Sequence, residues 1–426
     1  MPFTPGNETS GNLSAVGLAR ETTFNTPVTP SQFDPFNSLA LGADPGLFFP
    51  QVMQGIREAD VFALYGQEKM AGGLDSPLFP HNGILAWIAA VGHDGSQSGS
   101  STTAVNGTIG AASAGATTIT WTAVTGVPVS GSYIQVGIAA NGVFGVSALG
   151  TGIAPSQVIK VTAVTGSGPY TLTVPALAYA IVASGAGQNN TAQAVIAPFF
   201  HAVIPGVRPC SLTIEKNMGG LQSEQFSGCM VNTFALKLPT SNAEASFSAD
   251  LMAASVAVLD TPSAITGIDD GLPFVFAEGA LSLFGQSLNT VSNVTVTLGN
   301  TVKDTYTVGS SHMPTYLTPT TRTVSGQLTV IFYSLDDSTY GYFKKALPSL
   351  ATSGVPTQGA LSLTLAHPDL TAFNIVLPQI NIEKIADEVK IGDMIMQTLD
   401  FKASYNIASS GILTSYFSNN VAYAPY

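Results

Sequence analysis

The residues that could do chemistry are few in this 426-residue chain, and they lie far apart. Its five histidines lack His-x-x-x-His spacing, and no Cys-x-x-Cys pair occurs, so a zinc site would need distant residues to meet in space. No Gly-Lys dipeptide and no Gly-x-Ser-x-Gly sequence occurs, so neither a phosphate-binding loop nor a nucleophile elbow is present by motif. We therefore expect no catalytic residues, no metal and no cofactor.

Three paired acids could in principle bind calcium or transfer protons: Asp269-Asp270, Asp336-Asp337 and Asp387-Glu388. Their contexts favour a turn, a helix cap and a solvated loop respectively. The cation pair Lys344-Lys345 ends a predicted helix, where positive charge favours the helix dipole. All four pairs are thus interpreted as structural.

Composition limits the class of protein. Charged residues make up 9% of the chain, against roughly 25% in ordinary soluble domains, and small and β-branched residues replace them. Such a chain suits extensive sheets and subunit contacts. A net charge of −12 argues against a protein that holds nucleic acid by neutralising phosphates, but it is compatible with a wall past which DNA slides.

The elements that would carry any functional face are mainly strands. Residues 234–238 and 399–402 alternate apolar and polar side chains, the pattern of a sheet with one wet face. The Ile-Glu-Lys strands at 214–216 and 382–384 place their glutamates on the polar side. The candidates for a polar sheet face or lumen are therefore Glu215, Glu383, Asp400, Lys237 and Lys402.

Two helices are predicted. Asn82 caps Gly83 to Val91, with Gly92 at the position after the helix, and Asp336 or Asp337 caps Ser338 to Leu347 before Pro348. Trp87 lies in the first, most apolar run and is expected in the core. That run is far shorter than the roughly 18 residues of a membrane-spanning helix, and no secretory signal is visible.

A separate module is predicted from charge. Between Asp94 and Arg208 the one charged side chain is Lys160, and short β-type runs alternate with Gly, Pro and Ser turns. We interpret 94–198 as an inserted small all-β domain, facing outward, with linkers at 95–100 and 185–188.

Outside this insert a weak repeat is visible. Residues 212–216 return as 380–384, and Gly228-Cys229-Met230-Val231 returns as Gly392-Asp393-Met394-Ile395. The repeat predicts two modules, 1–93 with 199–260 and 261–426, whose loops 217–225 and 385–391 are equivalent hairpins. The first hairpin would turn at Gly219-Gly220 and bring Cys210 and Cys229, expected as free thiols, roughly opposite each other. Candidate ring-stacking residues are Gly219, Gly220, Glu224, Asp387 and Glu388.

Four segments, in order, resemble the phage tail tube proteins. They are Gly17-Leu18-Ala19-Arg20-Glu21, the run 72–80 before the apolar helix, Leu212-Thr213-Ile214-Glu215-Lys216, and 399–405 with 419–423. The insert resembles the small β-domains that decorate phage tail and capsid proteins.

The resemblance implies a mainly β fold: two tandem tail-tube-like sandwich or barrel modules, each with a flanking helix, plus the insert. It implies a virion tail subunit, assembled in the host cytoplasm, with other tail proteins, the tape measure protein and then passing DNA as partners, and with no membrane. A duplicated chain favours rings of three subunits with pseudo-sixfold symmetry over hexamers. The alternatives are a β-rich virion surface protein or adhesin that binds host glycans, and another phage structural subunit.

Overall fold

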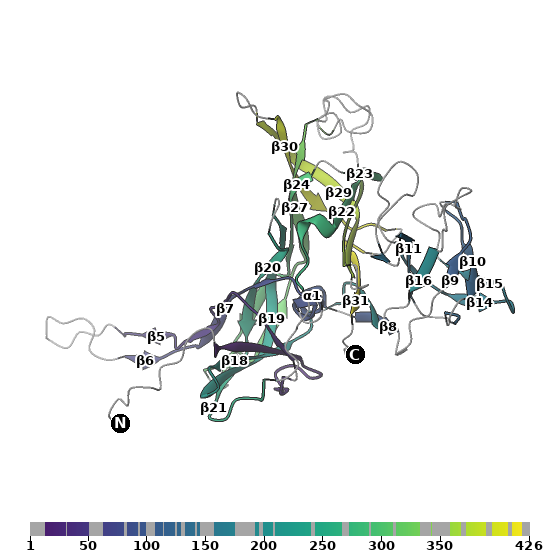
Figure 1. Ribbon diagram of the computed structural model, residues 1–426. Coiled ribbons are helices and arrows are strands. Elements are labelled where there is room, and N and C mark those ends of the chain that lie inside the picture. The colour runs from purple at the N-terminus through teal and green to yellow at the C-terminus, as the bar shows by residue number, and fades with distance from the viewer. Residues whose placement is uncertain are drawn as a thin grey trace, which may run out of the picture.

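The computed structural model of the chain is an elongated β-rich body with an insert on one side and a two-stranded arm on the other (Figure 1). It describes residues 13–30, 32–50, 63–80, 83–92, 94–98, 107–113, 115–123, 126–128, 133–140, 143–144, 157–174, 192–195, 199–207, 209–239, 243–265, 272–288, 291–309, 312–332, 342, 358–367, 372–388, 394–407 and 411–419.

A central antiparallel sheet runs the length of the body. Its strands are, in spatial order, the interrupted edge β3 (Ser38–Leu39) and β4 (Gly42–Asp44), then β7 (Lys69–Pro77), β20 (Ser246–Ala253), β19 (Gln222–Leu238), β24 (Val291–Gly299), β27 (Thr323–Ile331), β30 (Met396–Ala403) and β29 (Ala372–Glu388). The pairing of β19 with β24 joins the two halves of the chain in one sheet.

The two 17-residue strands, β19 and β29, each serve a second sheet with their first half. The first outer sheet has the order β2 (Gln32–Asp34), β1 (Ala15–Arg20), β18 (Leu212–Met218), β19 and β21 (Ser255–Leu259). The second has β23 (Gln286–Leu288), β22 (Gly279–Leu283), β28 (Gly359–Ala366), β29 and β31 (Thr414–Asn419). Strand for strand, the second half of the chain repeats the pairing of the first.

Matching β-bulges strengthen this correspondence. In β19 the register shifts between Val231 and Thr233, and in β29 between Ile382 and Lys384. Both long strands also carry an irregularity against their outer neighbours β18 and β28. A bulge inserts one residue at a fixed place in a ladder, so these shifts identify β19 and β29 as equivalent strands. Asn232 in the first half of the chain is the counterpart of Glu383 in the second.

This equivalence corrects the alignment predicted from sequence. Residues 380–384 lie in β29, the counterpart of β19, whereas residues 212–216 lie in β18, the counterpart of β28. The loops 217–225 and 385–391 are therefore not equivalent. The shared Ile-Glu-Lys motif does not identify equivalent strands, because so short a β-type motif can occur in any strand. The strand pairing and the bulges do identify them.

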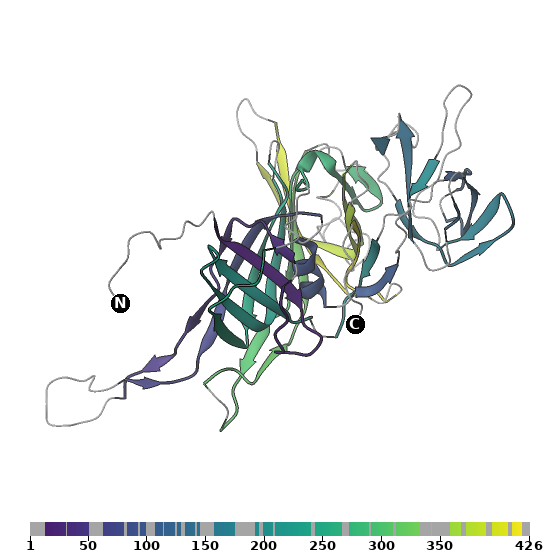
Figure 2. The same ribbon diagram turned by 60° about the horizontal axis from the view of Figure 1, so that its bottom comes forward.

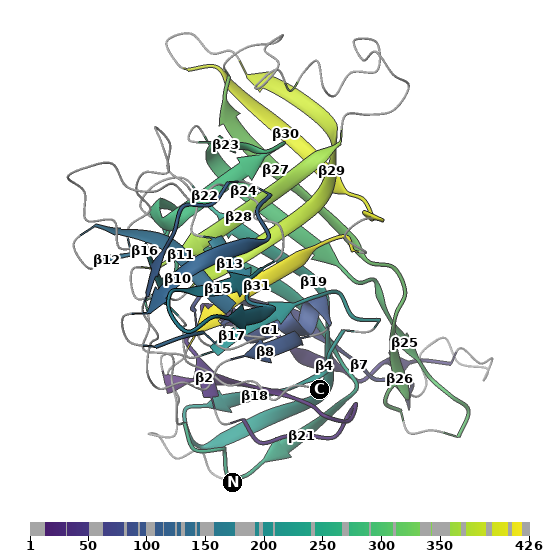
Figure 3. The ribbon, with the colours of Figure 1, turned by 90° about the vertical axis from the view of Figure 1, so that its right-hand side faces the viewer.

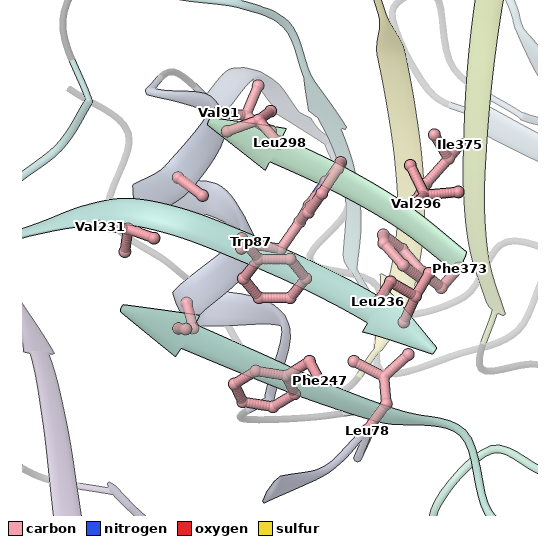
Figure 4. Close-up of a cluster of buried hydrophobic side chains, with 14 of the residues drawn as sticks. Leu78, Trp87, Val91, Val231, Leu236, Phe247, Val296, Leu298, Phe373 and Ile375 are labelled. Atoms are coloured by element: carbon pink, nitrogen blue, oxygen red, sulfur yellow. The ribbon is translucent and has the colours of Figure 1, made fainter. Parts of the chain in front are cut away.

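The core lies between the central sheet, the outer sheets and the helix α1 (Gly83–Val91). Helix α1 has the predicted bounds; Gly92 follows at φ 106° and donates its N–H to the Ile88 carbonyl at 2.8 Å. Trp87 is fully buried, as predicted, and its ring lies edge-on to that of Phe234. It also lies edge-on to the ring of Phe373 (Figure 4). Its two aromatic neighbours belong to β19 and β29, so the halves share one core.

The predicted second helix falls largely outside the described residues. Tyr342 is helical and buried, and it packs against the common core. Residues 269–270, 336–337 and 344–345 also lie outside.

The insert forms its own antiparallel sheet, in the order β12 (Val143–Phe144), β11 (Tyr133–Ala140), β16 (Ala192–Val195), β9 (Gly107–Ile109), β10 (Thr118–Ala123), β15 (Tyr170–Thr173) and β14 (Ala163–Thr165), with β13 (Gln157–Lys160) on β11. It lies beside the body, on the side away from the arm (Figures 1 and 3). The expected linker at 95–100 is instead largely strand: β8 (Asp94–Ser98) pairs with β17 (Phe199–Val203), which pairs with β31. A neighbouring strand can order a Gly- and Ser-rich tract that has little preference of its own.

Two ribbons project from the body, visible as the purple and the green extensions in Figure 2. One is the arm, which leaves the central sheet after β4, forms β5 (Leu47–Phe48) with β6 (Leu64–Tyr65) and returns in β7. The other is β25 (Val302–Thr305) with β26 (Tyr316–Pro319), between β24 and β27. The two ribbons occupy the same place in the repeated pairing.

Candidate assembly and channel surface

One face of the central sheet packs on the core, and the other carries polar side chains across all its strands. The register aligns Ser248, Ala235, Thr297, Ser325 and Lys402 in one row across five strands. The next row aligns Ser246, Lys237, Thr295, Gln327, Asp400 and Lys384. We call this side the polar sheet face. Its side chains are half-buried or exposed, while the residues between them are buried, except for the half-buried Gly326.

Three of the predicted lumen candidates lie together on this face: Lys237, Asp400 and Lys402. Asp400 accepts a hydrogen bond from Gln327 Nε2 at 2.7 Å, across the β27–β30 pair. Asp250 occupies the position in β20 that Asp400 occupies in β30, because each pairs with the residue next to the bulge. The face carries both lysines and aspartates, so it is charge-balanced rather than acidic.

The fourth candidate, Glu383, is the bulged residue of β29 and is exposed beside this face. A bulged residue is left out of the ladder, so its side chain is aimed by the local kink rather than by the strand alternation.

The fifth, Glu215, does not face solvent, so the predicted exposure is wrong. Its carboxylate is fully buried and accepts hydrogen bonds from Ser263 N at 2.8 Å and Ser263 Oγ at 2.6 Å. The segment at Ser263 thus covers Glu215 on this side of β18. Alternation with a period of two predicts on which side of a strand a polar side chain lies. It does not predict whether another segment of the chain covers that side.

A second buried carboxylate, Glu21, fixes the segment that follows β1. Its Oε1 accepts hydrogen bonds from Thr213 Oγ1 at 2.9 Å and Gly228 N at 2.8 Å, and its Oε2 accepts one from Asn25 N at 2.9 Å. Burial, and then the nearby Glu21 charge, raise the pKa of the Cys229 thiol well above its ordinary value. The Gly-Leu-Ala-x-Glu run is thus a structural signature: its glutamate ties the N-terminal segment to the bulge at Gly228.

The predicted turn at Gly219-Gly220 is present. Both glycines have positive φ, 64° and 77°, and Gly220 N donates to Asn217 Oδ1 at 2.7 Å. Glu224 is not in the loop but in β19, where it meets Lys216 Nζ at 3.1 Å across the hairpin.

Asp387 and Glu388 end β29, so they too belong to a strand rather than to the predicted loop. Asp387 Oδ1 accepts a hydrogen bond from Gln397 Nε2 at 2.8 Å, and Glu388 pairs with Met396. Both free cysteines are buried, and the Cys210 thiol donates to the Gly92 carbonyl at 3.0 Å.

The two projecting ribbons are braced against each other at their bases. Tyr306 Oη donates to the Glu68 carbonyl at 2.6 Å, Glu68 N donates to the His312 carbonyl at 2.9 Å, and His312 Nδ1 lies 2.7 Å from the Gly66 carbonyl. Burial, followed by the charges of Asp304 and Glu68, raises the pKa of Tyr306 to about 12.

Large apolar side chains of both ribbons are exposed: Leu47, Phe48, Phe49, Leu64, Tyr65, Val308 and Tyr316. An isolated two-stranded ribbon is marginal in water, and a contiguous exposed apolar surface marks a place where another protein binds. These ribbons have the character of subunit contacts.

The described residues offer little for catalysis. No group of three or more His, Cys, Asp or Glu side chains is placed to hold a metal ion among them, and no helix in these ranges is long and apolar enough to cross a membrane. His367 stacks on Phe274, and its Nδ1 lies 2.6 Å from Glu278 Oε1. This pair holds the segment 272–278 against the end of β28.

A charge-balanced sheet face, exposed apolar ribbons and a duplicated strand pattern together define a structural subunit built to assemble with others. The sequence profile of the family described as phage tail tube protein matches residues 11–403, and the chain belongs to this family. It is therefore a structural protein of the viral tail, in a family that is generally not enzymatic. Comparison with individual curated proteins gave no match.

Proposed function

We propose that the chain polymerises into stacked rings that form the conduit for DNA during ejection, with the polar sheet face lining the lumen. The observation that carries this is the face itself. Hydroxyl and amide side chains cover it from β20 to β30, and lysines and aspartates both occur among them. Such a wall offers no continuous basic track on which phosphates would be retained.

Three subunits per ring are favoured over six. Each half of the chain contributes four strands in the same spatial order, β3/β4–β7–β20–β19 and β24–β27–β30–β29. One subunit then supplies two of six similar sectors. The modules, 1–93 with 199–260 and 261–426, are the units of this pseudo-sixfold arrangement.

Stacking between rings is assigned to the hairpin tip at Gly219-Gly220 with Glu224, to the end of β29 at Asp387 and Glu388, and to the two apolar ribbons. The exposed Leu221 at the tip supports a contact there. Other tail proteins and the tape measure protein would meet the same surfaces, and the tape measure would occupy the lumen before DNA does.

The insert is an outward decoration. Because β8 and β17 already pair, with Ser98 opposite Phe200, a short turn can replace residues 99–198 without disturbing the body. Tubes should still form from this variant. Loss of assembly would show that the insert is part of the tube wall.

The direct test is electron microscopy of the purified protein at rising concentration, beside the variant Leu221→Lys. Wild type should form hollow tubes, and the variant should give rings or short stacks because it buries a charge between rings. A protein that stays monomeric or forms solid fibres would refute the tube. Normal tubes from Leu221→Lys would refute stacking through this tip.

A further inference from the structure

The segment 272–278 lies at the junction between the two halves of the chain. Its Phe274 is fully buried, donates its N–H to the Leu78 carbonyl at 3.0 Å and accepts a hydrogen bond from Ala245 N at 2.6 Å. His367, which follows β28 in the second half, stacks on the Phe274 ring with the two ring centroids 4.7 Å apart. Residues from both halves of the chain therefore hold this segment in place.

Both ring nitrogens of His367 lie beside hydrogen-bond acceptors. Nε2 is 2.9 Å from the Leu272 carbonyl oxygen, and Nδ1 is 2.6 Å from Glu278 Oε1. The other oxygen of this carboxylate already accepts a hydrogen bond from Val275 N at 3.1 Å. A carbonyl oxygen has no proton to donate, so Nε2 must carry one, and a neutral imidazole then has none left for Nδ1. The contact with Glu278 therefore requires a second proton.

This second proton belongs to the ring, because an imidazole is a stronger base than a carboxylate. The side chains of His367 and Glu278 are only 8% and 19% exposed, so water has little access to replace their hydrogen bond. Removal of the proton would leave the Nδ1 lone pair facing a carboxylate oxygen. An attractive, charge-assisted contact would then become a repulsive one in a mostly buried site.

The neighbouring elements supply no charge that could replace this proton. Strands β22 and β28 contain no charged residue, and β29 contains none before Glu383. Glu244 forms a β-bridge with Val275, but it is exposed to solvent. Within the described part of the chain, Glu278 is the charged group that faces the ring.

We infer that His367 and Glu278 form a proton-dependent clamp on the segment 272–278, which the imidazolium holds closed and which opens as the pH rises. When the segment opens, the ring returns to water, where a histidine ordinarily changes charge between about pH 5 and 8. As the pH rises through this range, the open form comes to bind one proton fewer than the closed form. Closing is then weakened by up to about tenfold for each unit of pH. The clamp belongs to the single chain and does not depend on tube assembly.

The test is amide hydrogen exchange of residues 272–278 in the full chain, read by mass spectrometry from about pH 5 to about pH 8. Rates are divided by the intrinsic exchange rate at each pH to give a protection factor. In wild type this factor should fall as the pH rises, by up to about tenfold per unit. A protection factor that stays constant over the range would overturn the clamp.

Glu278→Gln separates the shared proton from packing alone. The new amide can donate to Nδ1 of a neutral ring and accept from Val275 N, while Nε2 keeps its proton for the Leu272 carbonyl. Protection in this variant should therefore stay level or rise with pH, and a fall parallel to that of wild type would contradict the inference. Glu244→Gln is the matched control, because it removes an exposed carboxylate beside the same segment. It should behave like wild type, and loss of the pH dependence in this control would reject Glu278 as the partner.

Two further measurements decide the matter even where Glu278→Gln does not fold. His367→Gln has no titrating ring in the clamp, so its protection factor should not depend on pH; a fall as large as in wild type would reject the role of this ring. In NMR of wild type with nitrogen-labelled histidine, the signal that is absent from His367→Gln should show two protonated ring nitrogens at about pH 5. A neutral ring at this pH would overturn the clamp.

Discussion

Replacing Trp87 by Ala tests whether the two halves of the body share one core. The indole is fully buried, lies 5.2 Å from the Phe234 ring and 5.7 Å from the Phe373 ring, and donates from Nε1 to Ser415 Oγ at 2.8 Å. Truncating a buried Trp costs about 3–5 kcal/mol, and the cavity here would open between β19 and β29. Trp87→Phe keeps most of the ring and should cost about 1–2 kcal/mol, chiefly the hydrogen bond.

The assay uses the other tryptophan as an internal control. Trp121 is buried in the insert and donates to the Gly126 carbonyl at 3.1 Å, so in Trp87→Ala its emission reports the insert alone. In urea, circular dichroism of the body should show one transition moved to lower concentration. The midpoint from Trp121 should not change. A body transition that splits in two, with the 261–426 half unmoved, would refute the shared core.

Three further predictions follow from contacts of single residues. Gly326→Ala should lower the free energy of unfolding by about 1–3 kcal/mol, because the new methyl group meets the Thr295 carbonyl and the Phe401 ring. In the control Gly73→Ala the methyl group meets nothing within 4 Å, so the melting temperature should be nearly unchanged. Equal losses of stability in the two variants would contradict this packing. Glu215→Gln should lower the free energy of unfolding, measured in urea, by about 1–3 kcal/mol. Glu224→Gln, at a half-exposed carboxylate, should lower it by less than about 1 kcal/mol. The reverse order would show that Glu215 is not buried. The pKa of Tyr306 is raised from 10.0 to about 12, so its stabilisation is complete below pH 10 and is lost as pH rises to about 12. The difference between alkaline absorbance titrations of wild type and Tyr306→Phe should have its midpoint near 12, and a midpoint near 10 would contradict the burial of this hydroxyl beside Asp304.

Elements whose structure depends on neighbouring residues alone could be predicted from the sequence. The alternation at 234–238 and 399–402 identified the buried and polar sides correctly, because a single period of two decides both. Helix α1 was predicted residue for residue, since a Gly stop and an unbroken apolar run leave little choice of bounds. The β-rich fold follows from such signals, whereas the family follows from the resemblance of four short segments.

Tertiary coverage could not be predicted in the same way. Glu215 has the spacing of a residue on the solvent-facing side of a sheet, yet Ser263, from a segment about fifty residues later in the chain, covers it. The strand β8 has a linker's composition, and its order comes from β17, about a hundred residues later in the chain. The repeat is detectable as sequence similarity between the two halves of the chain. Its correct alignment depends on the bulges and the strand pairing, which no short motif encodes.

The central claim is that three copies of this chain close a ring whose inner wall is the polar sheet face. Cryo-electron microscopy of assembled tubes measures this most directly. We predict three subunits per ring, with Lys237, Asp400 and Lys402 pointing into the lumen. Six subunits per ring, or a lumen lined by another surface with the polar sheet face outside, would contradict it.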